Sequence, residues 1–179
     1  SGARVFLDLK FHDIPNTVAH AVRSAAKLGV FMVNIHALGG SEMMMRAAEA
    51  ARESDNKPKL LGVTVLTSMD QSSMGEVGID KKIEDEVVSL ARLGKDSGLD
   101  GVVASPNEVS LIRKNLGKDF IIVTPGIRPA GAKRDDQKRI MTPADAIGAG
   151  ADYIVVGRPI IETKDPLEAA RKIIKEMES

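Results

Sequence analysis

The sequence predicts an α/β fold built around a parallel β-sheet, and three observations support this fold class. Short apolar runs alternate with longer segments of helical periodicity, at spacings of about 20 to 30 residues. The apolar runs are nearly continuous, as expected for strands that are covered on both faces. Strands that alternate with helices imply a parallel sheet with right-handed crossovers. No linker or run of like charge divides the chain, so residues 1–179 are predicted to form a single domain.

The individual strands and helices are predicted from these runs and from the residues that flank them. The strands are expected at residues 5–9, 31–37, 59–66, 101–104, 120–124 and 153–157. The helices are expected at residues 17–28, 41–53 and 82–97, from residue 105 onward, from residue 142 to 148 or 150, and from residue 165 onward. Two longer segments, residues 67–81 and 125–141, are predicted to be loops.

Local signals explain where the helices begin and end. Pro15 stops the first strand, and Asn16 or Thr17 can cap the helix that follows. Gly29 can end that helix, because glycine readily adopts the left-handed conformation after a C-cap. Ser41 is expected to cap the second helix. A proline is accepted in the first turn of a helix, because its missing N–H has no intrahelical partner there. Three later helices are predicted to begin in this way, at Pro106, Pro143 and Pro166.

Two architectures fit this alternation, a doubly wound sheet and a (β/α)8 barrel. Polar residues at the carboxyl ends of the predicted strands favour the barrel, because such residues gather on the catalytic face of that fold. These residues are Asp8, Lys10, His36, Thr67, Ser105, Thr124 and Arg158. The six strand–helix units are two fewer than an eight-stranded barrel requires.

The composition of the 179 residues narrows the classes of function. Lysine plus arginine and aspartate plus glutamate both number 25, so no overall field attracts nucleic acid or a membrane surface. Aromatic residues make up 3% of the chain, which argues against stacking of bases on aromatic side chains. No apolar run approaches the roughly 20 residues that span a bilayer. The absence of cysteine excludes disulfides and thiolate metal sites, and it fits a reducing cytoplasm.

The most informative stretch is residues 8–17, with the sequence DLKFHDIPNT, directly after the first apolar run. Asp8 and Lys10 should point to the same face, because side chains alternate along a strand. A carboxylate and an ammonium at the end of a buried strand are costly unless they pair or take part in chemistry. A structural ion pair at the strand-to-helix junction is the simpler alternative.

This stretch resembles the signature of the orotidine 5'-monophosphate decarboxylase family, in which D-x-K-x-x-D runs into I-P-N-T. Four later segments resemble the same family in the same order, so the resemblance extends over almost the whole chain. They are residues 63–68 (VTVLTS), 124–128 (TPGIR), 135–139 (DDQKR) and 152–159 (DYIVVGRP). The resemblance implies decarboxylation of orotidine 5'-monophosphate to UMP and carbon dioxide in pyrimidine biosynthesis, in the cytoplasm and without a metal or an organic cofactor.

The fold of that family is a (β/α)8 TIM barrel, so the resemblance implies that six of its eight strand–helix units are present here. Two further units would precede residues 8–17, and residues 1–4 would be the tail of the second helix. One lysine and one aspartate of the family's site belong to those two units. We therefore expect the chain as given to bind nucleotide weakly and to turn over poorly.

The resemblance assigns catalytic roles to Lys10, Asp8 and Asp13. Lys10 is expected to hold positive charge near C6 of the pyrimidine and to deliver a proton there. Asp8 is expected to hold the Lys10 ammonium in place, near the departing carboxylate. Asp13, Ile14 and Thr17 resemble the family segment that reaches the neighbouring subunit's site, which implies a homodimer with shared active sites. For Asp13 the alternative is an acid that is favoured by the positive end of a helix.

The other substrate-binding residues are expected in later segments. By resemblance, Thr67 contacts the pyrimidine edge, while Arg128 and Gln137 contact the nucleotide from a lid formed by the second long loop. Gly157 and Arg158 follow the last strand and resemble a phosphate site, where backbone N–H groups and a guanidinium can hold an anion. A solvated surface arginine is the alternative for Arg158.

Two other functions fit parts of this pattern. Sugar-phosphate relatives, such as hexulose-phosphate synthase, share D-x-K-x-x-D but use Mg²⁺ to stabilise an enediolate. Residues 14–17 (IPNT) and the pair Asp136-Gln137 favour the pyrimidine enzyme. A catalytically inactive phosphate-binding dimer is the second alternative. The three histidines of the chain are not at metal-ligand spacing, so no metal site is predicted.

Overall fold

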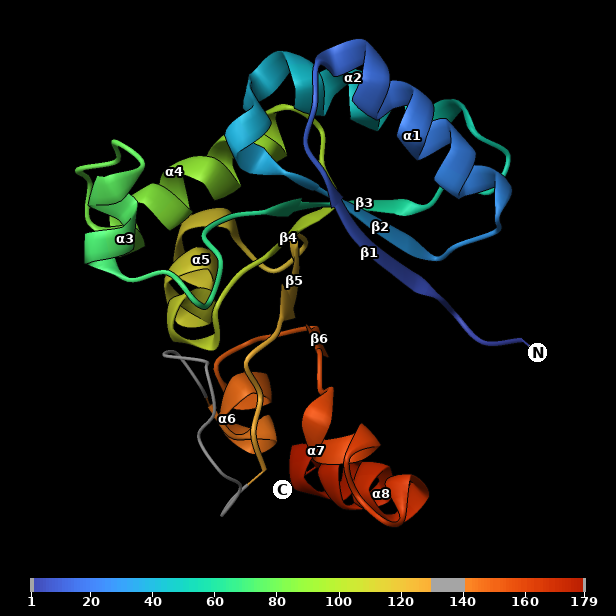
Figure 1. Cartoon of the computed structure of the whole chain (residues 1–179), viewed down its shortest axis with the longest axis vertical. Coiled ribbons are helices and arrows are strands. Elements are labelled where there is room, and N and C mark those ends of the chain that lie inside the picture. Colours follow the sequence, from blue (N-terminus) through green and yellow to red (C-terminus); the bar gives the residue numbers. More distant parts are fainter. Residues whose placement is uncertain (1, 130–140, 179) are drawn as a thin grey trace.

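The computed structural model describes residues 2–129 and 141–178 of the chain. Within these residues, the centre of the molecule is a sheet of six strands (Figure 1). The strands are β1 (Phe6–Phe11), β2 (Met32–His36), β3 (Lys59–Val63), β4 (Gly101–Val103), β5 (Ile121–Thr124) and β6 (Tyr153–Ile154). Every predicted strand is therefore confirmed, although β3 and β6 both end earlier than expected.

The strand order decides between the two predicted architectures. A doubly wound sheet reverses its strand order where the chain crosses back, whereas a barrel adds each new strand to the same growing edge. Here each strand from β1 to β6 pairs in parallel with the next one along the chain. The sheet also curls as it proceeds (Figure 1). The barrel type of winding is confirmed, while a complete ring of eight units stays a prediction.

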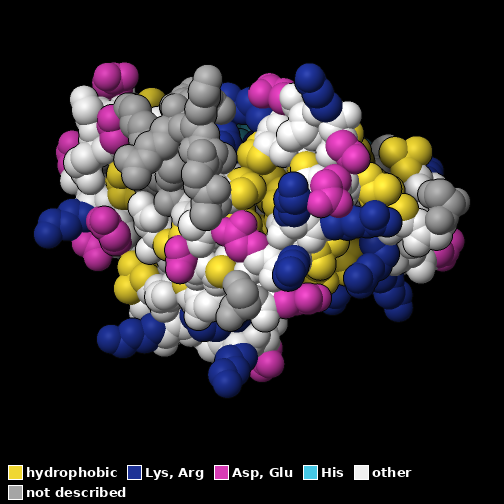
Figure 2. Space-filling model, turned by 90° about the horizontal axis from the view of Figure 1, so that it is seen from below, with side chains coloured by type: hydrophobic (Ala, Val, Ile, Leu, Met, Phe, Trp, Pro, Cys, Tyr) yellow, Lys and Arg dark blue, Asp and Glu magenta, His cyan; other side chains and the backbone are white. Residues whose placement is uncertain are grey.

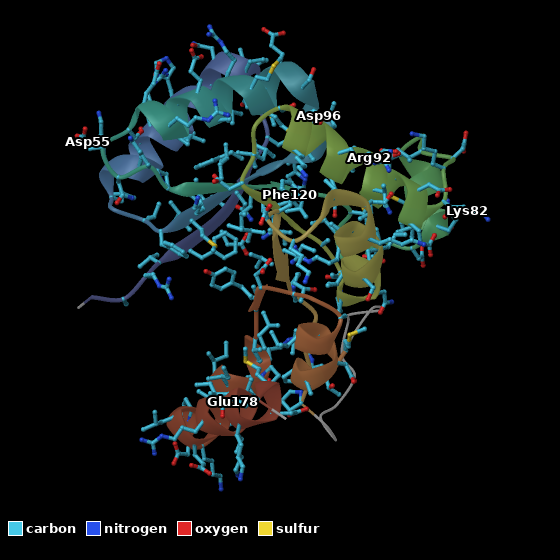
Figure 3. All side chains as sticks on the ribbon, turned by 180° about the vertical axis from the view of Figure 1, so that it is seen from behind. Asp55, Lys82, Arg92, Asp96, Phe120 and Glu178 are labelled. Atoms are coloured by element: carbon cyan, nitrogen blue, oxygen red, sulfur yellow. The ribbon has the colours of Figure 1, made fainter. Side chains whose placement is uncertain are left out.

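Helices cover the outer side of the curled sheet (Figure 1). The longer ones are α1 (Pro15–Lys27), α2 (Gly40–Glu53), α4 (Ile83–Asp96), α5 (Val109–Leu116) and α8 (Pro166–Met177). The shorter ones are η1 (Ala37–Gly39), α3 (Gln71–Glu76), η2 (Pro106–Glu108), α6 (Pro143–Gly148) and α7 (Arg158–Ile161). Neighbouring helices are joined by side chains as well as by packing. Arg92 of α4 (Figure 3), for example, donates a hydrogen bond of 2.7 Å to the side-chain oxygen of Asn115 on α5.

Apolar side chains fill both faces of the sheet. The larger cluster lies between the strands and the helices, and it contains Val33 and Ile35 of β2. Phe120, just before β5, belongs to the same cluster and is labelled in Figure 3. A smaller cluster lies on the other face, inside the curl. Its buried members are Met32, Leu61, Val63, Val103 and Val123. Because both faces of β2 to β5 are largely buried, these strands are apolar at nearly every position, as the sequence indicates.

Two α-helices of the structure are absent from the sequence prediction. The segment 67–81 is expected to be a loop, but it contains the helix α3. Asp70 caps this helix, since its Oδ1 accepts a hydrogen bond of 3.0 Å from Ser73 N, and Met74 anchors the helix in the core. The second unpredicted helix, α7, begins at Arg158, directly after the predicted strand 153–157. Both helices are too short to give a periodic pattern in the sequence.

The caps predicted for two helices are wrong. Helix α1 begins at Pro15, so Asn16 and Thr17 lie inside its first turn rather than before it. Helix α2 begins at Gly40, so Ser41 also lies inside the helix. In α1 the proline itself opens the helix, because its φ is already close to the helical value and it has no N–H group to satisfy.

The surface carries charges of both signs. Figure 2 shows acidic and basic side chains mixed over the face seen from below, with hydrophobic side chains between them. This mixture agrees with the equal numbers of acidic and basic residues in the sequence. In the described part of the chain, no helix combines the length and the apolar character needed to cross a membrane.

Candidate active site

The carboxyl end of β1 departs from a regular strand. The register of β1 against β2 shifts between Leu7 and Phe11, where three residues of β1 oppose the single residue Asn34 of β2. Within this bulge Lys10 has a positive φ of 52°, which residues other than glycine rarely adopt. Bulges of this kind redirect side chains, and they are frequent beside active sites.

The predicted pairing of Asp8 with Lys10 is confirmed, since Lys10 Nζ donates a hydrogen bond of 2.7 Å to Asp8 Oδ1. Its predicted cause, regular alternation along a strand, is wrong, because the two side chains meet through the bulge. The Lys10 and Asp8 side chains are 37% and 43% exposed, respectively. An ion pair with this exposure contributes at most about 1 kcal/mol to stability, because solvent screens it. Stability alone therefore does not account for the strained backbone that supports the pair.

Asn34 is a residue of this site that the sequence pattern did not reveal. Its side chain is fully buried in the middle of β2. The side-chain Nδ2 donates a hydrogen bond of 2.6 Å to Asp8 Oδ1, and the side-chain Oδ1 accepts one of 2.8 Å from Lys10 N. The signal that could have found it is a lone amide within an apolar run, because a buried polar side chain needs hydrogen-bond partners.

A cavity of about 220 Å³ opens beside this pair, at the carboxyl ends of the strands. Asp8, Lys10 and Thr67 line it, so the structure brings three of the predicted site residues together. The remaining lining residues are mostly apolar: Phe6, Val63, Val65, Leu66, Ser68, Val103, Ala104, Pro125 and Val155. A few polar groups that converge in an apolar cavity are typical of a small-molecule site.

A larger cavity, of about 530 Å³, lies at the opposite end of the strands. It is formed where α1 and α2 end, and it is lined by residues such as Arg23, Lys27 and Glu53. None of the predicted site residues lines it. Size therefore does not identify the active site of this molecule, whereas the placement of the functional groups does.

Two histidines stand next to the pair. The rings of His12, which follows β1, and His36, at the end of β2, have centres 5.3 Å apart. Burial lowers the pKa of His36 below its usual value of 6.5, and the charges of His12 and Lys10 lower it further. Nδ1 of His36 is buried with no hydrogen-bond partner among the described residues. In the same part of the chain, neither histidine belongs to a group of three side chains that could hold a metal ion.

Three predicted residues lie outside the cavity of their own chain. Asp13, Ile14 and Thr17 are exposed, and they stand just before α1 or in its first turn. Asp13 Oδ1 accepts a hydrogen bond of 2.7 Å from Ile14 N, which fixes the carboxylate at the start of the helix. The Ile14 side chain is 66% exposed, an unusual position for so large an apolar group.

The predicted phosphate-binding residues are only partly described. Arg128 is buried, and its Nη1 donates a hydrogen bond of 3.0 Å to the preceding carbonyl oxygen. Gly157 directly precedes α7, and Arg158 is the first residue of that helix. In the described structure these three residues do not line the cavity, although both segments that carry them contribute other residues to it. Gln137 and most of the predicted lid, residues 125–141, lie outside the described residues.

The chain is similar in sequence to proteins of one family over nearly its whole length. The sequence model of the orotidine 5'-phosphate decarboxylase / HUMPS family matches residues 1–173. Orotidine 5'-phosphate decarboxylase from Syntrophotalea carbinolica is 59% identical over 181 residues, which cover 98% of this chain and 74% of that protein. The protein of the same name from Trichlorobacter lovleyi is 58% identical over 176 residues, covering 97% and 73%. The chain thus spans about three quarters of the length of these curated relatives.

Solved structures of similar fold cover almost the whole chain as well. Orotidine 5'-phosphate decarboxylase from Lactobacillus acidophilus is similar with a TM-score of 0.86 and 43% identity, over 99% of this chain and 77% of that one. An uncharacterized conserved protein from Geobacillus kaustophilus has a TM-score of 0.84 and 38% identity, over 98% and 77%. The sequence relatives, the similar structures and the signature at the end of β1 all indicate the same family. The chain therefore belongs to the orotidine 5'-phosphate decarboxylase / HUMPS family.

Proposed function

We propose that this protein decarboxylates orotidine 5'-monophosphate to UMP and carbon dioxide, a step of pyrimidine biosynthesis. The observation that carries the proposal is the Asp8–Lys10 pair, joined at 2.7 Å on the lining of a mostly apolar cavity. The relatives that share more than half of its sequence are named for this reaction, which supports the same substrate here.

In this proposal Lys10 carries the chemistry. Loss of carbon dioxide from C6 of the pyrimidine leaves an electron pair on that carbon. A cation held nearby stabilises this charge, and the effect is larger in a cavity that excludes water. Lys10 Nζ then gives a proton to C6, so a C6–H bond replaces the C6–carboxylate bond and the amine is reprotonated from solvent. Asp8 keeps the ammonium in position near the departing carboxylate.

The rest of the nucleotide is bound by groups further along the chain. Thr67 lines the cavity and offers a hydroxyl to the pyrimidine edge. Arg128, Gln137, Gly157 and Arg158 are assigned to the nucleotide and its phosphate. Phosphate binding far from C6 can provide binding energy that is used at the reacting carbon. The proposal includes no metal and no organic cofactor.

The proposal also includes a homodimer with shared active sites. Asp13, Ile14 and Thr17 are exposed and lie outside the cavity of their own chain, which supports a role in the neighbouring subunit's site. An isoleucine that is 66% exposed would also gain from burial at such an interface. The consecutive parallel strands support a single (β/α)8 barrel domain as the complete fold. A cytoplasmic location fits the cysteine-free composition.

The test follows the loss of orotidylate absorbance, using protein expressed from its complete coding sequence in buffer that contains a chelator. We expect turnover without added metal. Lys10→Ala should lower kcat by about 10²- to 10⁴-fold, because the variant lacks both the charge near C6 and the proton donor.

Lys59→Ala is the matched control. Lys59 also pairs with an aspartate, since its Nζ lies 2.9 Å from Asp100 Oδ1, but it begins β3 at the opposite end of the sheet. This variant should keep the wild-type kcat. A requirement for Mg²⁺ would instead favour a sugar-phosphate relative. Binding of UMP without any turnover would favour the inactive phosphate-binding dimer.

A further inference from the structure

We propose that Asn34 is a positioning residue of the active site, whose buried amide holds Asp8 and Lys10 in the conformation that the reaction needs. The proposal rests on the proposed function, since it assigns Asn34 to the same site. Asn34 does not line the cavity, so it acts on the substrate only through the two residues that do.

The bulge in β1 creates the need for such a residue. Three residues of β1 stand opposite Asn34, so regular backbone pairing between β1 and β2 is interrupted there. The side chain of Asn34 fills this gap, because its Oδ1 accepts the hydrogen bond from Lys10 N at 2.8 Å. This bond is made to a residue with a positive φ, a conformation that persists only where its surroundings enforce it.

The other half of the same amide fixes the carboxylate. Asn34 Nδ2 donates to Asp8 Oδ1 at 2.6 Å, and Lys10 Nζ donates to the same oxygen at 2.7 Å. Two donors on one oxygen leave the Asp8 carboxylate little freedom to rotate, and hydrogen bonds to an ionised acceptor are the stronger kind. Asp8 and Lys10 are both substantially exposed, whereas Asn34 is fully buried. The rigid member of the trio is therefore Asn34.

Asparagine is suited to this position because one short side chain must both donate and accept. Leucine, of similar size, can do neither. Aspartate keeps an acceptor for Lys10 N but has no N–H for Asp8, and it places a second carboxyl group beside the first. Without the amide, the end of β1 can relax toward a regular strand. A change of register by one residue turns every side chain to the opposite face, which would remove Lys10 from the cavity.

The test compares three variants of the full-length protein. Asn34→Leu removes both hydrogen bonds, and Asn34→Asp removes only the donor to Asp8. The control is Thr64→Val, which removes a buried hydrogen bond from Thr64 Oγ1, just after β3, to the carbonyl oxygen of Val103 on β4 without touching the pair. For each variant, kcat and KM for orotidylate are measured, together with hydrogen exchange at the Lys10 backbone amide.

We expect both Asn34 variants to lower kcat by about 10- to 100-fold with KM nearly unchanged, because misplacing a catalytic group affects the chemical step. The Lys10 amide should exchange rapidly in Asn34→Leu and should stay protected in Asn34→Asp and in Thr64→Val. A purely structural role would not separate kcat from KM, and it would not separate the exchange behaviour of the two Asn34 variants.

The proposal is overturned if Asn34→Leu keeps the wild-type kcat, or if its Lys10 amide stays as protected as in the wild type. If Asn34→Leu does not fold, Asn34→Asp decides, and a wild-type kcat in that variant overturns the proposal. A wild-type protein that does not turn over orotidylate would instead disprove the proposed function. In that case the exchange measurement still shows whether Asn34 holds the end of β1.

Discussion

At the scale of single residues, the site depends on a small number of contacts that share atoms. Asp8 Oδ1 accepts hydrogen bonds from both Lys10 Nζ and Asn34 Nδ2, so the three side chains cannot move independently. The pair is too exposed to add much to stability, and its backbone is strained. We interpret this combination as a site shaped for chemistry, because strained conformations cluster where function requires them.

His36 should make the stability of the protein depend on pH. Burial, followed by the charges of His12 and Lys10, lowers its pKa in the folded state. Around pH 6.5 and below, the unfolded chain then binds more proton at this histidine than the folded chain does, so the free energy of unfolding falls as the pH drops. We expect His36→Gln to remove this part of the decrease. Denaturant unfolding of wild type and variant between about pH 5 and 7.5 measures it.

As the pH falls, the free energy of unfolding of the wild type should therefore decrease more than that of His36→Gln. His20→Gln, which removes an exposed histidine of α1, is the control for the loss of an imidazole at the surface. Parallel pH profiles for wild type and His36→Gln would contradict the prediction.

At the scale of secondary-structure elements, close approach of strands limits which residues are accepted. Gly101 begins β4 and pairs with Ile121 of β5. A Cβ atom at position 101 would press against the Ile121 carbonyl oxygen and would lie 2.6 Å from the Ile121 Cβ. Gly75 in α3 has open space around the same position. A side chain is therefore excluded at Gly101 but accepted at Gly75, although the sequence does not distinguish the two positions.

We expect Gly101→Ala to lower the free energy of unfolding by about 1 to 3 kcal/mol, because backbone atoms must move to make room. Gly75→Ala should raise it by about 0.5 to 1 kcal/mol, because alanine favours a helix and meets no obstacle there. Chemical denaturation of both variants gives the comparison. Equal changes in the two variants would show that β4 and β5 are less tightly packed than the structure indicates.

At the scale of the whole molecule, the proposed dimer makes a prediction about mixed subunits. If Lys10 of one subunit and Asp13 of the other form one site, Lys10→Ala and Asp13→Ala are both inactive alone. A dimer that contains one copy of each variant has one site with both defects and one intact site. Co-expression of the two variants should therefore restore about a quarter of the wild-type activity, since half of the randomly formed dimers are mixed.

Lys10→Ala co-expressed with Asp8→Asn is the matched control for this experiment. Asp8 and Lys10 belong to the same chain's cavity, so every site in a mixed dimer would carry one defect. No activity should return. Recovery in this control, or its absence in the first mixture, would show that Asp13 does not serve the neighbouring subunit.

Much of the fold could be predicted because it depends on local patterns. Apolar runs with polar carboxyl ends located all six described strands, and the residues 8–17 located the site. The predictions that were wrong concern features too small to be periodic, such as α3 and α7, or positions where proline and glycine replaced the expected caps. The role of a residue such as Arg128, buried but outside the cavity lining, is still a prediction.

The sequence by itself determined the alternation of strands and helices and the barrel end that holds the polar residues, and it placed Asp8 and Lys10 two positions apart at that end. The alternation of strands and helices follows from periodicity, which is a property of neighbouring residues. Only the tertiary structure decided how that pair is held. The bulge in β1, the positive φ of Lys10 and the contact with Asn34 join residues that lie 24 and 26 positions apart. Contacts of this kind depend on how two strands are aligned, and strand alignment is set by packing across the whole sheet.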